Sequence, residues 1–213
     1  MSRILVIGAT KGIGLNVVEY GLERGHTVRA FARSADKMTL EHDALERWAG
    51  DATRSEDLEP ALKDVDAVVM CLGIEESVSM IWKKVTLFSD ATRALLPLME
   101  AHGPKRFLAV TGIAAGESIS ALSWVERQGH AFLLGEPYKD KTRQEELVKA
   151  SNLDWTIARP VILTKRPMTG QYRVLTEPKD WRMGLISRKD VAHFLIHAIE
   201  DNAYVHEAPV LAR

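Results

Sequence analysis

Three glycines near the amino terminus are spaced in a way that suits phosphate binding. The segment reads Gly8-Ala9-Thr10-Lys11-Gly12-Ile13-Gly14 and follows a β-branched run at 4–7. A helical pattern begins in this segment and stops at Gly25. Such a turn lets the backbone approach a pyrophosphate, whose charge is met by free N–H groups and the positive end of the helix dipole. The segment therefore predicts a dinucleotide site; the alternative is a tight turn that binds nothing.

The second expected strand, at 27–32, ends without an acidic residue. A carboxylate there would bind the ribose 2'-hydroxyl and repel a 2'-phosphate. The chain instead has Arg33 and Ser34, with Lys37 one turn further on and Lys11 inside the glycine turn. Guanidinium, hydroxyl and ammonium groups suit a phosphate, so the sequence predicts NADP(H). The alternative for Arg33 and Lys37 is that they are solvated surface charges.

Tyr138, Lys141 and Thr111 are the candidate catalytic residues. Carbonyl reduction needs a proton donor, and a tyrosine of pKa about 10 needs nearby positive charge to serve as one. Pro137 predicts a helix start, which would place Tyr138 in the first turn, near the positive end of the dipole. Lys141, three residues later, would be its neighbour on the helix surface. The alternative for Tyr138 is packing or surface display, and Lys141 also suits ribose binding.

Strands and helices that would position these residues alternate over about 160 residues. Further strands are expected near 48–49 and at 67–71, 106–110 and 155–158, with helices at about 79–102 and 137–150. Continuous apolar strands separated by helices predict an α/β fold, a Rossmann-type doubly wound parallel sheet with helices on both faces. The ligand crevice should lie at the carboxyl ends of the strands. We expect a single domain over residues 1–213.

The carboxyl-terminal part departs from this alternation. Short strands are expected at 171–175 and 184–187, followed by a helix at 190–200 that is capped by the region 187–190. Long loops are expected at 74–81 and 113–136, and loops of that length are usually functional. We therefore expect the substrate side to be formed by 74–82, 113–140 and 160–188.

Composition narrows the class of protein. The net charge of −1 gives no electrostatic footprint for a nucleic acid. No apolar run of about 18 residues is present, and Cys71 is the single cysteine, which predicts a cytoplasmic protein without a membrane span. His102, His193 and His197 lack partners at metal-ligand spacing, so no metal is expected. The expected partner is a small-molecule substrate, and the expected state is a monomer or a homodimer.

The chain resembles the atypical short-chain dehydrogenase/reductases, in particular the NAD(P)H-binding, NmrA-like group that includes biliverdin-IXβ/flavin reductase. The residues that carry the resemblance are 7–10, 50–52, 72–73, 141–155, 159–160, 169–174 and 186–192. The resemblance implies that Asp51 and Ala52 face adenine, although Asp51 is also a candidate N-cap. It also implies nucleotide contacts for Cys71, Leu72, Gly73 and Ile74, and nicotinamide contacts for Pro160, Val161, Ile162 and Leu163.

Three positions depart from the pattern of that group. The glycine spacing is Gly-x-x-x-Gly-x-Gly, which strengthens Lys11 as a phosphate contact. Thr111 is followed by Gly112, so a second hydroxyl is missing. The Tyr-x-x-x-Lys pair becomes Tyr138 to Lys141, which is one residue short and places Pro137 in the tyrosine position.

The sequence favours an NADPH-dependent oxidoreductase that reduces a flavin, a quinone or another conjugated small molecule. Such acceptors need no dedicated tyrosine, because water can supply the proton. One alternative is a non-catalytic NADP(H)-binding redox-sensing regulator, and a second is a carbonyl reductase or epimerase that uses Tyr138. Aromatic side chains that would stack on a flat substrate are Trp124, His130 and Phe132, with Trp82 and Trp181 as weaker candidates; loop packing is their alternative.

Overall fold

A single eight-stranded sheet organises the chain. The computed structural model describes residues 1–74, 85–121 and 124–213. The strand order is β3-β2-β1-β4-β5-β6-β10-β8, and every neighbouring pair is parallel except β10 and β8. The strands are β1 Arg3–Ile7, β2 Thr27–Ala32, β3 Leu45–Ala49, β4 Ala67–Met70, β5 Arg106–Val110, β6 Asp154–Pro160, β8 Arg173–Leu175 and β10 Val210–Ala212. The predicted α/β fold class is confirmed.

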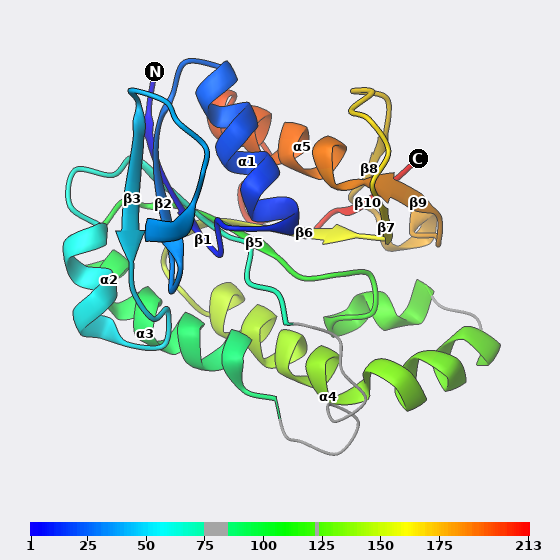
Figure 1. Cartoon of the computed structure of the whole chain (residues 1–213). Coiled ribbons are helices and arrows are strands. Elements are labelled where there is room, and N and C mark those ends of the chain that lie inside the picture. The colour runs from blue at the N-terminus through cyan, green and yellow to red at the C-terminus, as the bar shows by residue number, and fades with distance from the viewer. Residues whose placement is uncertain (75–84, 122–123) are drawn as a thin grey trace.

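Helices cover both faces of this sheet (Figure 1). One face carries α1 (Gly12–Glu23) and α5 (Arg188–Glu200), and the other carries α2 (Ser55–Ala61), α3 (Leu87–His102) and α4 (Trp124–Lys149). Side chains of β1 alternate between the two faces, with Ile4 and Val6 in one apolar cluster and Leu5 and Ile7 in the other. Because both faces are buried, the strand shows a continuous apolar run in the sequence.

The helix predicted at 79–102 is shorter than expected. In the described residues, α3 begins at Leu87, and 85–86 are not helical. The carboxylate of Asp140 in α4 accepts hydrogen bonds from the backbone N–H groups of Phe88 (2.8 Å) and Ser89 (3.3 Å). This satisfies two free donors of the first turn of α3 from another helix. Because the cap is distant in sequence, no local signal marks this boundary.

The helix predicted at 137–150 begins much earlier, so the loop predicted at 113–136 is wrong. A 3-10 helix occupies Gly116–Ala121, and α4 starts at Trp124 with Pro137 inside it. The segment before Pro137 contains several good helix formers, which favour continuation. Pro137 therefore marks no helix start, and Tyr138 lies in mid-helix, away from the positive end of the dipole. Proline here removes one backbone donor without ending the helix.

The carboxyl-terminal elements follow the prediction closely. The strand β9 (Leu185–Ser187) pairs in parallel with β7 (Ile162–Thr164) to form a separate two-stranded sheet. Ser187 caps α5, because its Oγ accepts a hydrogen bond from the backbone N–H of Asp190 at 2.9 Å. Two strands were not predicted: β7, and β10, which lies between β6 and β8 in the main sheet. Of the helices in the described ranges, none is long and apolar enough to cross a membrane.

Candidate nucleotide and substrate site

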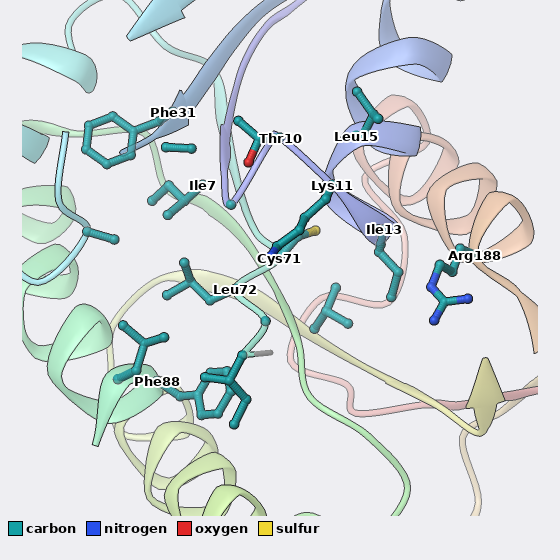
Figure 2. Close-up of a pocket in the computed structure, with 18 of the residues that line it drawn as sticks. Ile7, Thr10, Lys11, Ile13, Leu15, Phe31, Cys71, Leu72, Phe88 and Arg188 are labelled. Atoms are coloured by element: carbon teal, nitrogen blue, oxygen red, sulfur yellow. The ribbon is translucent and has the colours of Figure 1, made fainter. Parts of the chain in front are cut away.

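One large cavity opens at the carboxyl ends of the strands, where the fold places a ligand crevice. Its volume is about 1630 Å³, and Figure 2 shows part of its lining. The predicted site residues that line it are Gly8, Thr10, Lys11, Gly12, Ile13, Arg33, Ser34, Lys37, Asp51, Ala52, Cys71, Leu72, Gly73, Thr111, Tyr138, Lys141, Pro160, Val161 and Ile162. Gly14 lies behind the turn. The structure therefore brings these residues together, while what each one binds stays a prediction.

The glycine turn is built from close backbone contacts. Gly8 has a φ of 86°, and a Cβ there would lie 2.7 Å from the carbonyl oxygen of Cys71 in the neighbouring strand end. A Cβ on Gly14 would overlap the carbonyl oxygen of Gly8. Gly12 has a φ of 62°, but a Cβ there would face open space. Two of the glycines are thus needed for packing, and Gly12 is needed for its backbone conformation.

The start of α1 suits a pyrophosphate. Its N-cap residue, Lys11, makes no side-chain capping bond, and the first turn contains no acidic residue. The first turn itself therefore supplies no carboxylate that would compete with a ligand for its N–H groups and the positive end of the dipole. The turn fits the diphosphate of a dinucleotide.

The part of the cavity that follows β2 and β3 has basic and acidic lining residues. Arg33 and Ser34 follow β2, and Lys37 lies in the short 3-10 helix at Ala35–Lys37. The carboxylate of Asp51 accepts hydrogen bonds from Thr53, from its N–H at 2.9 Å and its hydroxyl at 2.8 Å, and these lower the pKa of Asp51. The N-cap of α2 is Arg54, so the reading of Asp51 as the cap of that helix is wrong.

Tyr138 and Lys141 lie at the opposite end. The ammonium nitrogen of Lys141 is 5.0 Å from the centre of the Tyr138 ring and donates a 2.7 Å hydrogen bond to the carbonyl oxygen of Thr111. A Cβ on Gly112 would lie 2.8 Å from the hydroxyl oxygen of Tyr138. Gly112 thus leaves the space that this hydroxyl fills. The pair remains close despite its short spacing, and both side chains face the cavity.

A buried charge pair lies directly behind this end. Glu145 accepts hydrogen bonds from the Arg159 guanidinium at 3.0 and 2.6 Å, and neither side chain is accessible beyond 1%. The Thr111 hydroxyl donates to the same carboxylate at 2.7 Å. The one hydroxyl proton of Thr111 is therefore directed into the protein, and Thr111 presents no donor to the cavity in this arrangement.

Lys141 has an unusual environment for a lysine. Desolvation lowers its pKa to about 8, and the negative charge of Glu145 opposes that shift. Its ammonium group also lies 5.3 Å from the ring centre of Phe88. At neutral pH most Lys141 side chains are charged, and a modest rise in pH neutralises them.

Trp181, His193 and His197 lie outside the cavity lining. Trp181 is buried outside the cavity lining and donates a hydrogen bond to the carbonyl oxygen of Leu175, so it does not stack on a ligand. His193 and His197 pair with the hydroxyls of Tyr172 and Tyr20. Trp82 and the side chains of Trp124, His130 and Phe132 fall outside the described residues. Among the described residues, no cluster of three metal-ligating side chains occurs.

Sequence reasoning missed Phe88, and it included Met183 and Arg188 only within the expected substrate-side range 160–188, without naming either as a ligand contact. Arg188 directly follows a strand, and the rule that ligands bind at the carboxyl ends of strands was the signal that could have found it. Phe88 reaches the cavity only because α3 packs on α4, which no local pattern reveals.

Comparison with protein families identifies residues 8–202 as a match to the NAD(P)H-binding family. A sugar epimerase of Bacillus subtilis, described as uncharacterized, is 29% identical over 93% of this chain and 88% of its own length. A photosystem II assembly factor of Synechocystis is 26% identical over 93% of this chain, which spans 58% of that protein.

Solved structures support the fold. An anaerobillin reductase from Escherichia coli superposes with a TM-score of 0.82 at 23% identity, covering 99% of this chain and 97% of that one. A short-chain dehydrogenase/reductase from Veillonella parvula, solved in complex with NADP, gives a TM-score of 0.82 at 16% identity, covering 100% and 94%. At these identities the likeness concerns the fold alone.

Proposed function

This chain belongs to the NAD(P)H-binding family, and we propose that it is an NADPH-dependent oxidoreductase that reduces a flavin, a quinone or another conjugated small molecule. The observation that carries the proposal is the continuity of the cavity, which extends from the glycine turn to Tyr138 and Met183. Pockets for one small ligand are usually about 300–1000 Å³. At about 1630 Å³, this cavity has room for a dinucleotide and an acceptor.

The proposed cofactor is NADP(H) rather than NAD(H). The end of β2 offers Arg33 and Ser34 in place of a carboxylate, and Lys37 lines the same part of the cavity. A guanidinium and a hydroxyl complement a 2'-phosphate, which a carboxylate would repel.

The bound nicotinamide would supply the hydride. The residues of this chain bind and orient: the turn at 8–14 holds the phosphates, and Lys141 and 160–162 border the reacting end. With Thr111 directed toward Glu145, Tyr138 and Lys141 are side chains of the described lining that can donate a proton at that end. A conjugated acceptor can take its proton from water, so its reduction needs no proton donor from the protein.

The test is NADPH oxidation by the purified protein with a panel of flavins, quinones and aldehydes. We expect reduction of at least one flavin or quinone. A protein that binds NADPH tightly and reduces none of the panel would contradict the enzyme proposal.

That outcome would favour the second candidate, a non-catalytic NADP(H)-binding regulator. The specific observation behind it is that the hydroxyl of Thr111 donates to Glu145. The next residue, Gly112, has no side-chain hydroxyl that could replace it. An assembly factor among the relatives agrees with such a role.

A carbonyl reductase or epimerase is the third candidate, supported by Tyr138 beside the ammonium of Lys141. Positive charge favours the release of a proton from a phenol. Tyr138→Phe would abolish carbonyl reduction if the hydroxyl donates the proton, whereas a fully active variant would exclude this candidate.

We also propose that the protein is cytoplasmic, acts as a monomer or homodimer, and binds neither nucleic acid nor membrane. The support is the balanced net charge of −1 and the single, buried thiol of Cys71.

A further inference from the structure

Arg188 is a cation that lines the cavity, and its side chain has no hydrogen-bond or ion-pair partner among the described residues. It follows β9, begins α5 and lines the cavity, and Figure 2 shows it with Ile13 on the side formed by α1 and α5. Within the described part of the chain, Arg188 forms no ion pair and no hydrogen bond. An arginine with several donors and no acceptor, held at a ligand cavity, is suited to receive an anion from the ligand.

The nearest acidic residue in sequence does not neutralise it. The carboxylate of Asp190 accepts hydrogen bonds from the N–H groups of Thr169 (2.7 Å) and Gly170 (2.9 Å) and from the hydroxyl of Ser187 (2.9 Å). The helix dipole does not explain the arginine either, because it favours acidic residues in the first turn. Arg188 therefore has no evident structural role at this position.

Apolar side chains line the cavity on β7, which pairs with the strand that precedes Arg188, and the sequence segment 161–189 is rich in basic residues. Ile162, Leu163 and Met183 line the cavity, and Ile162 is 56% exposed. The segment 161–189 contains two acidic residues, Glu177 and Asp180. Its seven basic residues are Lys165, Arg166, Arg173, Lys179, Arg182, Arg188 and Lys189. The excess of positive charge in this segment contrasts with the net charge of −1 for the whole chain, and positive charge near a ligand cavity attracts anions.

We propose that Arg188 binds an acidic substituent of the substrate while the conjugated body of the substrate lies on Ile162, Leu163 and Met183. The preferred acceptor is then an amphipathic anion, a flat apolar ring system that carries a phosphate or carboxylate. This inference rests on the proposed reductase function and adds a substrate class to it.

The test compares two flavins that share one ring system, flavin mononucleotide, which carries a phosphate, and riboflavin, which does not. With NADPH at pH 7.5, the wild-type protein should show a KM for flavin mononucleotide about tenfold below that for riboflavin, the effect of one charge-assisted contact. Arg188→Gln should remove this preference by raising the KM for flavin mononucleotide, with little change in kcat. Arg188→Lys should restore part of it.

Lys189→Gln is the matched control, because it removes one charge from the same turn at an exposed position that does not line the cavity. It should leave the ratio of the two KM values unchanged. Equal ratios in wild type and Arg188→Gln would overturn the proposal. A rise in the KM for NADPH with both flavins would also overturn it, because the guanidinium would then bind the cofactor.

A binding experiment tests the anion site independently of the reductase function. The affinity of each flavin for the protein saturated with NADP⁺ is measured by flavin fluorescence. If neither flavin is reduced, the reductase function fails for flavins. An Arg188-dependent preference for flavin mononucleotide in binding would still support the anion site, and equal dissociation constants in both proteins would reject it.

Discussion

The two ends of the cavity are held by different kinds of interaction. At the nucleotide end, Gly8 and Gly14 pack against backbone atoms of neighbouring segments, and local geometry sets the shape. At the substrate end, Thr111 is held by the buried pair of Glu145 and Arg159, which joins α4 to β6, and Lys141 donates a hydrogen bond to the carbonyl oxygen of Thr111. The first end therefore tolerates little change in residue size, whereas the second depends on charge contacts between distant segments.

The largest effect is expected from Glu145→Ala, which removes one side of the pair behind the substrate end. Removing one partner of a buried pair usually costs 3–5 kcal/mol, and Glu145 also accepts a hydrogen bond from Thr111, so we expect a loss of about 4 kcal/mol in the free energy of unfolding. Arg159 keeps a second ion pair at 3.0 Å with Glu117, which is 54% exposed and therefore screened by water. Urea denaturation measures the loss. Glu41→Ala is the control, because Glu41 pairs with Arg47 at the surface and should contribute little.

If Glu145→Ala does not fold, Glu145→Gln keeps the shape and removes only the charge. A free energy of unfolding equal to that of the wild type in either Glu145 variant would show that this pair does not hold the substrate end.

Gly14→Ala tests the nucleotide end in the same assay. The added methyl group would overlap the backbone of Gly8, which cannot move aside as a side chain can. We expect a loss of about 3 kcal/mol in the free energy of unfolding, together with weaker NADPH binding. Gly12→Ala is the matched control, because its Cβ meets open space and only its positive φ opposes it, at about 1 kcal/mol. Equal losses in both variants would contradict a turn shaped by packing.

Arg33→Ala should change cofactor choice without changing the fold. Loss of one charge-assisted contact to a 2'-phosphate corresponds to about 1.5 kcal/mol, or about tenfold in the dissociation constant for NADPH. NADH lacks that phosphate, and its dissociation constant should stay the same. Titration calorimetry with both cofactors measures the difference. Arg54→Ala, a nearby arginine outside the cavity lining, should affect neither cofactor, and equal losses for both in Arg33→Ala would reject the 2'-phosphate role.

The smallest effect concerns pH at the substrate end. Because Lys141 has its pKa lowered to about 8, kcat/KM should fall as the pH rises through about 8 and the ammonium is lost. Lys141→Arg stays charged, so its profile should remain flat over that range. A wild-type profile that stays flat to pH 9.5 would show that the charge of Lys141 is not needed.

The expected fall in kcat/KM above pH 8 would not result from unfolding caused by deprotonation of Lys141. An unfolded lysine has a pKa of about 10.4, so between about pH 8 and 10.4 the unfolded state binds more protons at this group than the folded state. The contribution of Lys141 to the free energy of unfolding therefore rises with pH in this range.

The nucleotide half could be predicted from sequence because its signals are local. The glycine turn, the apolar strands and the absence of an acidic residue after β2 are each contained in a few consecutive residues. The capped start of α5 at Ser187 was predicted for the same reason.

The substrate half depends on partners that are distant in the chain. Asp140 caps α3 from another helix, and the strand β10 is defined by its place between β6 and β8. The helix start predicted at Pro137 was wrong, because Pro137 lies inside α4. The local sequence does not distinguish a proline in the first turn of a helix from one that is tolerated further inside. The cavity position of Arg188 follows from packing rather than from a motif.

The contact between Gly112 and Tyr138 bears on how this site can diverge. A serine or threonine at 112 would need the space that the phenol oxygen now fills. A mutation that adds a hydroxyl at 112 is therefore incompatible with the present position of the ring at 138, and the two positions are expected to covary among homologues. The order of substitution is constrained as well: a lineage acquiring the second hydroxyl would first have to replace or displace Tyr138.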